Sequence, residues 1–517
     1  MKRLLKNGGG MMVAQFITVL ISFFSRKIFL MFLSVEFLGY ESVFSNVLTL
    51  LSVADLGLET VIISKLYHAV AIHDEEEAGK LLYIFKWFYR IVSAIVLIAA
   101  VIIAPFLPYI IRDASTSWDY LYIVYTMQIF AVIVGYFLSY RRAIFIADQK
   151  GSICTLCDMI GKIITQIAQI IVLVIYPNYL AYLLCRLCTA PLANILLKFR
   201  CDILYPFTKR NIKITRADIN EFNLLSEGKS YFIHKICALI FNATDTIVIS
   251  AFCGVVLAAM YSNYLSLVMA FTGLLISVPF QALQAAIGNR IQKCSSETQR
   301  QEEMEAFFLA SGIYSIQIGL GIFIFIQFAM MVWLGNQYLL PTSVAFLFSF
   351  IRAIVAMDYA NGCYRNPAGD FYKDKNYIVL AAFVNIVLSV LFAGKMGIEG
   401  VLLGTLVGQF ITNFSHVKVV VQKYSIPEKA TSFTVRQTIW PVLLLLEMGM
   451  AYYIFKDKLG IVSLPSLILK VVVWGAFGAA NFLILWFFPG HKEFRRYCKR
   501  FFRAMLHDIK KQEKYGK

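Results

Sequence analysis

The chain has 517 residues, of which 59% are hydrophobic and 15% charged, and its formal net charge is +17. A soluble chain is about 45–50% apolar and about 25% charged, so this composition excludes an ordinary water-soluble domain. The apolar residues lie in long runs, many near the ~20 residues that a helix needs to cross ~30 Å of hydrocarbon. They show no alternation of polarity, which a spanning β-barrel would require. The sequence therefore predicts an all-α polytopic membrane protein.

We expect about fourteen transmembrane helices, arranged as two pseudo-twofold six-helix lobes and two C-terminal helices. The expected regions are an N-terminal lobe (1–199), a cytoplasmic linker (200–230), a C-terminal lobe (231–421), two last helices (438–488) and a basic amphipathic tail (491–517). In chain order the expected spans are 10–33, 38–63, 83–108, 119–140, 152–176, 179–199, 231–252, 257–285, 306–332, 341–361, 377–396, 398–421, 438–455 and 461–488.

The distribution of Lys and Arg predicts the orientation of these helices. If both termini are cytoplasmic, the segments on the cytoplasmic side of these spans hold 33 of the 48 basic residues. The opposite loops hold only Arg112, Lys395, Lys456 and Lys458. Such a bias is typical of multi-pass proteins of the cytoplasmic membrane. It accounts for most of the positive net charge, so we expect no nucleic-acid partner.

A short repeat links the two predicted lobes. "FSNVL" (44–48) and "YSNYL" (261–265) both fall early in the second helix of a six-helix set. This placement indicates parallel repeats, the usual frame of an alternating-access transporter. The tail 491–514 places apolar side chains along one helical stripe among basic residues, which suits the anionic inner leaflet; a solvated charged tail is the alternative.

Several short motifs suggest catalysis or metal binding, but their context favours simpler interpretations. Cys154 with Cys157, and Cys185 with Cys188, have the spacing of zinc ligands, yet they lie within predicted spans and are interpreted as buried apolar residues. "GKS" (228–230) lacks the first glycine of a phosphate-binding loop, because position 223 is Asn. We expect no enzyme, no metal site and no bound cofactor.

Charged residues inside predicted spans are the main candidates for function, because ionisable groups in hydrocarbon are costly. Each also has a structural alternative, such as an ion pair or a contact at the interface. The candidate cations for the substrate are Arg26, Lys162, Arg186 and Arg352. The candidate acids for ion pairing or coupling are Asp245 and Asp358. The uncharged candidates for sugar contacts are Gln166, Gln281 and Asn242.

Three segments in order resemble one protein family. "NVLTLLSVADLGLETVIISKLYHAVAIHDEEEAGKLLYIFKWFYRI" (46–91), "YRRAIFIADQKGSI" (140–153) and "NYLAYLLCRLCTAPLANILLKFRCDILYPF" (178–207) resemble motifs of bacterial polysaccharide transporters. That family includes the Wzx-type oligosaccharide flippases and belongs to the multidrug/oligosaccharidyl-lipid/polysaccharide (MOP) flippase superfamily. "FSRK" (24–27) is similar to an aromatic-small-Arg pattern whose Arg lines the central cavity of related flippases.

The resemblance implies a function and a place in the cell. It implies a flippase in the bacterial cytoplasmic (inner) membrane that moves polyprenyl-pyrophosphate-linked oligosaccharides from the cytoplasmic to the outer leaflet. The glycan is a precursor of O-antigen, capsule or exopolysaccharide, so glycosyltransferases and a polysaccharide polymerase are possible partners. Energy comes either from an H⁺ or Na⁺ gradient or from consumption of the product outside. The resemblance assigns a cavity role to Arg26 alone; the roles of the other cations are our inference.

Three other functions remain open from the sequence. A cation-coupled multidrug exporter of the same superfamily shares the twelve-helix core, but it favours acids over cations in its cavity. A membrane polysaccharide polymerase acts on lipid-linked sugars, but it needs a large outer loop, and the longest predicted outer loop has about ten residues. A membrane scaffold does not explain the buried charges.

Overall fold

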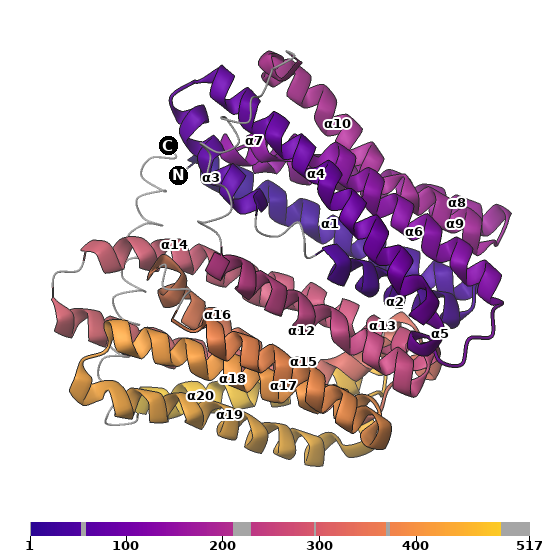
Figure 1. The fold of residues 1–517 in the computed structure, drawn as a ribbon. Helices are drawn as coiled ribbons and strands as arrows, with labels where there is room; N and C mark the ends of the chain where they lie inside the picture. The colour runs from indigo at the N-terminus through magenta and orange to yellow at the C-terminus, as the bar shows by residue number, and fades with distance from the viewer. Residues whose placement is uncertain (1, 53–57, 210–228, 294–295, 369–372, 488–517) are drawn as a thin grey trace, which may run out of the picture. The chain divides into compact units, whose positions relative to one another are not determined.

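The structure is a computed structural model of the chain. It describes residues 2–52, 58–209, 229–293, 296–368 and 373–487. The chain forms two compact units, unit 1 (Met1–Ser262) and unit 2 (Asn263–Lys517); their helices are labelled in Figure 1. The boundary falls within helix α13, and the predicted lobe boundaries stay a prediction. The predicted tail lies outside the described residues.

Unit 1 is built from α-helices, some of which begin with a side-chain cap. Ser34 accepts a hydrogen bond from the backbone N–H of Glu36, and Asp74 accepts one from the backbone N–H of Glu77. These bonds satisfy donors that a helix leaves open at its start. The helices are α1 (Lys2–Phe32), α2 (Val35–Leu51), α3 (Leu58–Ala71), α4 (Glu75–Ile103), α5 (Leu107–Ile110), α6 (Trp118–Ser139), α7 (Arg142–Ala147), α8 (Gly151–Ile175), α9 (Tyr179–Leu187), α10 (Thr189–Leu204), α12 (Lys229–Cys253) and the start of α13 (Val255–Thr272).

Unit 2 contains longer helices and tight helix contacts. Its cluster of buried apolar residues joins α15, α16 and α19, and includes Phe323, Ile354 and Leu444. At Gly404 a Cβ atom would lie 2.5 Å from the Ser389 hydroxyl oxygen, so α17 and α18 approach each other closely. The helices are α14 (Val278–Lys293), α15 (Glu297–Trp333), α16 (Thr342–Ala368), α17 (Lys375–Met396), α18 (Ile398–Tyr424), α19 (Pro427–Phe455) and α20 (Leu464–Phe487).

Eleven segments of the described residues are helices long and apolar enough to cross a membrane. The prediction of an all-α polytopic protein is therefore confirmed, whereas the count of fourteen is not. Helix α18 corresponds to the predicted span 398–421 but is not among the eleven. The predicted span 38–63 corresponds to α2 and α3, which flank residues outside the described part of the chain.

Because proline lacks the N–H of a helical hydrogen bond, the sequence predicts interruptions of helices at Pro191 and Pro279, and both residues lie next to interruptions. Pro191 follows the break between α9 and α10 at Cys188. Pro279 follows a π-helical turn, Gly273–Ser277, which separates α13 from α14. Proline lacks an N–H and leaves the carbonyl four residues earlier without its usual partner. In unit 2 that carbonyl belongs to Leu275, and the hydroxyl of Tyr314 donates a hydrogen bond to it.

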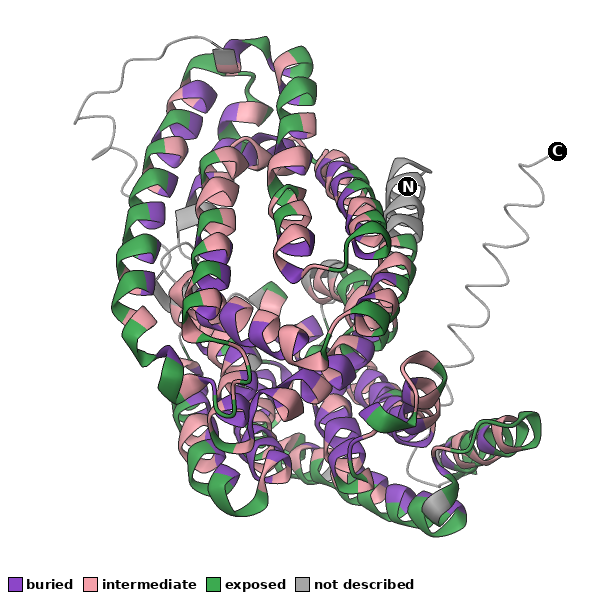
Figure 2. Cartoon of the chain, turned by 90° about the vertical axis from the view of Figure 1, so that its right-hand side faces the viewer, coloured by how far each residue is buried: buried purple, intermediate pink, exposed green. Residues whose placement is uncertain are grey.

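The long helices expose apolar residues along their length. On α4 the exposed side chains include Ile95, Ile98 and Ile102, which are 47%, 60% and 61% exposed. In Figure 2 exposed residues run along the helices of both units instead of gathering at helix ends. Large exposed apolar faces are unfavourable in water, and they suit helices that face lipid.

The three family-like segments of the sequence meet in one buried cluster of unit 1. Its members come from α3 and α4 in the first segment, from α7 in the second and from the end of α10 onward in the third, together with residues of α8 that directly follow the second segment. Phe145 packs edge-on against Tyr205, with ring centroids 5.4 Å apart. Cys154 and Cys157 are also buried in this cluster, where they pack as small apolar side chains.

Charged and polar side chains contact one another at this cluster, where the second and third segments meet. Tyr205 donates a hydrogen bond of 2.6 Å to Asp148, and the Lys150 ammonium lies 2.7 Å from the same carboxylate. Burial by itself raises the pKa of Asp148, but the hydrogen bonds from Lys150 and Tyr205 outweigh it and hold that pKa below its ordinary value. Burial and the bond to Asp148 raise the pKa of Tyr205, so its hydroxyl stays a donor.

Candidate functional site

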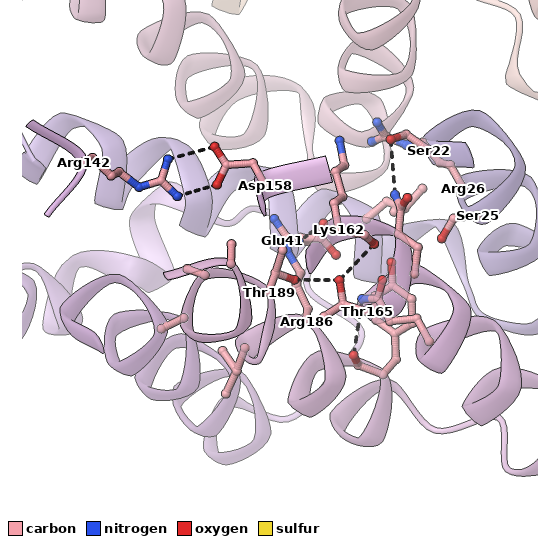
Figure 3. A pocket seen from close by; sticks show the side chains of 18 residues that line it. Ser22, Ser25, Arg26, Glu41, Arg142, Asp158, Lys162, Thr165, Arg186 and Thr189 are labelled. Atoms are coloured by element: carbon pink, nitrogen blue, oxygen red, sulfur yellow. Dashed lines mark hydrogen bonds and ion pairs between the residues drawn. The ribbon is translucent and has the colours of Figure 1, made fainter. Parts of the chain in front are cut away.

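A cavity of about 550 Å³ lies within unit 1. Its polar lining comes from α1, α2 and the helices from α7 to α10, and the close-up in Figure 3 shows these side chains around one space. The lining residues are Ser22, Ser25, Arg26, Leu38, Glu41, Ala131, Arg142, Asp158, Lys162, Thr165, Gln166, Gln169, Tyr182, Arg186, Leu187, Thr189, Ala190 and Ala193. We refer to this space as the unit 1 cavity.

Helix α8 supplies much of the polar wall of the cavity. Asp158, Lys162, Thr165 and Gln169 follow one another at intervals of three or four residues, which places them on one face of a helix. The Thr165 hydroxyl donates to the carbonyl of Gly161, and it accepts a hydrogen bond of 3.0 Å from Thr189 of α10. Gln166 donates to Ser22 of α1 at 3.2 Å. These bonds fix the wall between three helices.

One basic residue of the cavity is held firmly by acceptors. The Arg142 guanidinium binds both carboxylate oxygens of Asp158, and its Nε donates to Asn194 at 3.0 Å. Two parallel bonds between Arg and a carboxylate give a defined geometry as well as energy. Figure 3 shows this pair at one end of the labelled side chains.

The other two arginines of the cavity lie on α1 and α9. Arg186 forms an ion pair with Glu41 of α2. Arg26 donates a hydrogen bond of 2.9 Å to the hydroxyl of Ser262. The same hydroxyl accepts a bond of 2.8 Å from Ser42, the neighbour of Glu41. Arg26 and Arg186 line the same cavity, so each disfavours the positive charge of the other.

Lys162 differs from the arginines of the cavity. Among the residues that the structure describes, its ammonium group makes no hydrogen bond and no ion pair. The lining therefore contains four cations (Arg26, Arg142, Lys162 and Arg186) and two acids (Glu41 and Asp158). The surplus is two positive charges. A site with unused cationic donors and several neutral polar groups is suited to a multiply charged anion.

The structure brings together four of the nine residues predicted for the site. Arg26, Lys162, Arg186 and Gln166 all line the unit 1 cavity. Arg352 and Gln281 belong to unit 2; an Arg352 nitrogen lies 3.7 Å from the Met269 sulfur, and Gln281 is exposed. Asn242 is on α12, with a side chain outside the described part. Their proposed roles stay untested.

The two predicted acids lie outside the cavity lining. Asp245 of α12 is 4% exposed and accepts a hydrogen bond of 3.0 Å from Tyr261. Asp358 of α16 contacts His416 of α18, with 2.6 Å between the carboxylate and Nδ1. Both acids therefore have polar partners within their own unit.

Asp358 belongs to a larger network of charged side chains in unit 2. The other ring nitrogen of His416 lies 3.3 Å from Asp374. Asp374 accepts two hydrogen bonds from Arg365, at 2.6 and 2.9 Å, and these two residues are 1% and 5% exposed. We call Asp358, Arg365, Asp374 and His416 the α16–α18 network. Its charges bond mainly with one another.

Sequence reasoning missed the acids of the cavity. Glu41 lies only three residues inside the expected span 38–63 and was not among the candidates, whereas α2 begins at Val35 and places Glu41 six residues, about 9 Å, along the helix. Asp158 precedes Lys162 by four residues, a spacing that signals a shared helix face. Arg142 lies in the "YRRAIFIADQK" segment, which was used only as a family motif.

Comparisons with known proteins agree with this fold. A family model described as "Polysaccharide biosynthesis protein" matches residues 4–284. No curated protein matches the sequence. The solved structure "Lipid II flippase MurJ, inward closed conformation" has a TM-score of 0.66 and 14% identity, covering 92% of this chain and 99% of its own. An inward-facing multidrug resistance MATE family transporter of the MOP superfamily has a TM-score of 0.57 and 13% identity, covering 81% and 98%.

A mutant form of VcmN, a MATE transporter from Vibrio cholerae, is similar to the same degree, with a TM-score of 0.57, 13% identity and coverage of 82% and 98%. At these identities the likeness shows the fold alone. The chain thus has the fold of MOP superfamily flippases and transporters and is a multi-pass membrane protein, as the sequence resemblance implied.

Proposed function

Because the chain belongs to the polysaccharide biosynthesis protein family, we propose that it flips polyprenyl-pyrophosphate-linked oligosaccharides across the bacterial cytoplasmic membrane. Transport runs from the cytoplasmic to the outer leaflet by alternating access, and both termini face the cytoplasm. The product supplies the assembly of a surface polysaccharide such as O-antigen, capsule or exopolysaccharide. The observation that carries this proposal is the cation surplus of the unit 1 cavity.

The charge of the cavity matches the charged part of such a substrate. A pyrophosphate that links a lipid to a sugar carries two negative charges near neutral pH, and the cavity lining has two positive charges in surplus. Arg26 and Arg186 offer planar forks that bind phosphate oxygens in pairs, and Lys162 offers a compact charge. A cavity of about 550 Å³ is in the range of small-ligand sites, ~300–1,000 Å³, and has room for the pyrophosphate and the adjoining sugar.

The neutral polar groups of the lining suit the sugar. Each hydroxyl that enters hydrocarbon without a hydrogen bond costs roughly 2–7 kcal/mol, so the passage of several hydroxyls requires a polar path. Gln166, Thr165 and Tyr182 line the cavity beside the cations and provide donors and acceptors. The polyprenyl chain stays in the lipid bilayer, where it has no hydrogen bonds to lose. An H⁺ or Na⁺ gradient is the energy source we favour, with Asp245 as one candidate for the coupling acid.

Depletion of the protein in its native cell tests this function. We expect complete oligosaccharide units to accumulate on polyprenyl pyrophosphate, as measured by mass spectrometry, while surface polysaccharide falls. The intact protein restores both, and a chain with Arg26→Ala that reaches the membrane does not. Loss of a polymerase would make the same lipid-linked units accumulate, so the leaflet that holds them distinguishes the two functions. If the protein is a flippase, the units stay in the inner leaflet after depletion, and a glycan-cleaving enzyme added to intact spheroplasts cannot reach them.

A multidrug exporter of the same superfamily predicts a different result. Its loss leaves lipid-linked glycans and surface polysaccharide unchanged and makes the cell sensitive to cationic drugs. The cation surplus of the cavity opposes this function, because a cationic drug would meet like charges there.

A further inference from the structure

The two acids of the unit 1 cavity are held in different ways. Asp158 uses both oxygens to bind Arg142, which is in turn held by Asn194. Glu41 contacts Arg186 through one oxygen, while its buried Oε2 has no hydrogen-bond partner in the part of the chain that the structure describes. The Glu41 side chain is 18% exposed and borders the cavity. Glu41 is therefore the acid whose contacts are incomplete.

The groups around Glu41 explain why an acid is placed there. Arg186 shares the cavity lining with the like charges of Arg26 and Lys162, which disfavour its own positive charge. Without a ligand, Glu41 is the counter-ion that holds Arg186 beside the other positive charges of the cavity. An anion that enters brings its own negative charge to the guanidinium, and two carboxylate or phosphate groups on one arginine repel each other.

We infer that Glu41 is a positioning residue that competes with the substrate anion for Arg186. This inference rests on the proposed function, since it takes the pyrophosphate as the competing anion. In the empty cavity Glu41 holds the guanidinium in place. When the pyrophosphate binds, Arg186 exchanges Glu41 for phosphate oxygens, and when the substrate leaves, Glu41 takes Arg186 back. The competition weakens binding and speeds release, which a transporter needs in order to complete its cycle.

The location of Glu41 connects this exchange to the frame of unit 1. Its neighbour Ser42 shares the hydroxyl of Ser262 with Arg26, and a Cβ at Gly39 would lie 2.4 Å from the backbone oxygen of Val255. Helix α2 is thus in close contact with the start of α13. A change in the partner of Glu41 acts on a helix that has little room to shift independently.

Binding of a defined anion to the purified full-length protein tests the inference. The probe is a short-chain isoprenyl pyrophosphate that carries one N-acetylglucosamine, a pyrophosphate diester. Glu41→Gln removes the competing charge and keeps the size of the side chain. We expect about tenfold tighter binding by calorimetry, and a dissociation rate that is slower by a similar factor. A purely structural role of Glu41 predicts weaker binding instead.

Matched variants separate this effect from a general change of charge. Glu36→Gln changes the same charge on the same helix, but Glu36 bonds with Tyr40 and Ser115 and does not line the cavity, so we expect unchanged binding. Glu41→Asp keeps the charge and restores affinity toward that of the wild type. In a chain with Arg186→Gln, the further change Glu41→Gln has no effect, because the competition acts through Arg186.

The outcomes distinguish the inference from the proposed function. If the wild-type protein does not bind the probe, the proposed function is contradicted, and the inference with it. If the wild type binds, Arg186→Gln weakens binding and Glu41→Gln leaves it unchanged or weakens it, the inference alone is wrong. Thermal unfolding of each variant shows whether a loss of binding reflects a loss of fold.

Discussion

In unit 1 the charged side chains line a cavity whose lining has a net charge of two positive units. In the α16–α18 network of unit 2 the charged side chains instead form ion pairs with one another. Both regions contain arginine, acid and neutral polar groups, so composition does not separate them. The difference lies in the partners: Lys162 has none among the described residues, while Arg365 and Asp374 satisfy each other. A cation without a protein partner indicates a site for a ligand, whereas ion pairs whose members satisfy each other indicate structural support.

The largest expected effect tests the structural role of the network. Arg365→Met leaves Asp374, which is 1% exposed, without its main partner. Removing one member of a buried pair costs about 3–5 kcal/mol, so we expect a large fall in the melting temperature of the purified protein. Arg112→Met is the control, because both side chains of its pair with Asp113 are exposed, at 60% and 75%, and an exposed pair is worth about 0–1 kcal/mol. Equal falls in the melting temperatures of the two variants would contradict the structural role of the network.

A second prediction compares the packing of the two units. Gly404→Ala places a methyl group 2.5 Å from the Ser389 hydroxyl and 2.7 Å from its backbone nitrogen, and such overpacking costs roughly 1–3 kcal/mol. Gly161→Ala, beside the unit 1 cavity, meets its nearest atoms at 3.1 Å and is expected to cost less. Chemical unfolding measures both. A larger loss for Gly161 would mean that the wall of the cavity is the more rigid region.

A third prediction concerns the cation without a partner. Lys162→Ala orphans no acid among the described residues, so stability should stay within about 0.5 kcal/mol. Transport should fall about tenfold, which corresponds to ~1.4 kcal/mol of lost substrate binding. Flipping of lipid-linked oligosaccharide in proteoliposomes, together with thermal unfolding, measures the two quantities. Loss of stability without loss of transport would make Lys162 a structural residue like Arg365.

The smallest expected effect depends on pH and on the contact at Asp148. The folded-state pKa of Asp148 is lowered, so its stabilisation is complete above the unfolded value of ~3.9 and is lost as the pH falls through the lower folded value. We expect the melting temperature of Asp148→Asn to decline less than that of the wild type below about pH 4. Tyr205→Phe removes one donor to Asp148, so the decline of its melting temperature should lie between those of the wild type and Asp148→Asn. Parallel curves for all three proteins would contradict this role of Asp148.

The sequence predicts the helices well because hydrocarbon imposes a length and a composition on each of them. It predicts the breaks near Pro191 and Pro279 because proline removes a specific hydrogen bond. It does not predict that Tyr314 supplies a new donor to the carbonyl of Leu275, because that contact joins residues 39 positions apart. Local rules locate the interruption, and only the fold shows how it is stabilised.

The same limit applies to the candidate site. A charge in a predicted span is informative by itself, so Arg26, Lys162 and Arg186 were found. Whether a charge faces a cavity or another charge depends on helix rotation and on neighbours, so the sequence does not separate Arg352, which belongs to unit 2, from the cations that line the unit 1 cavity. Glu41 was missed because its significance comes from Arg186, which is 145 positions away in the sequence.

The buried cluster at which α3, α4, α7 and α10 meet has a consequence for the interpretation of sequence searches. The segments that make this chain recognisable contribute Phe145, Asp148 and Tyr205 to packing. They also contribute Arg142 and Arg186 to the unit 1 cavity, whereas Arg26, Glu41 and Lys162 of the same lining lie outside them. These segments therefore record how the helices are joined and include only part of the cavity lining. Relatives with the same segments can differ in the rest of that lining, so a classification by substrate should compare all the residues that line the cavity.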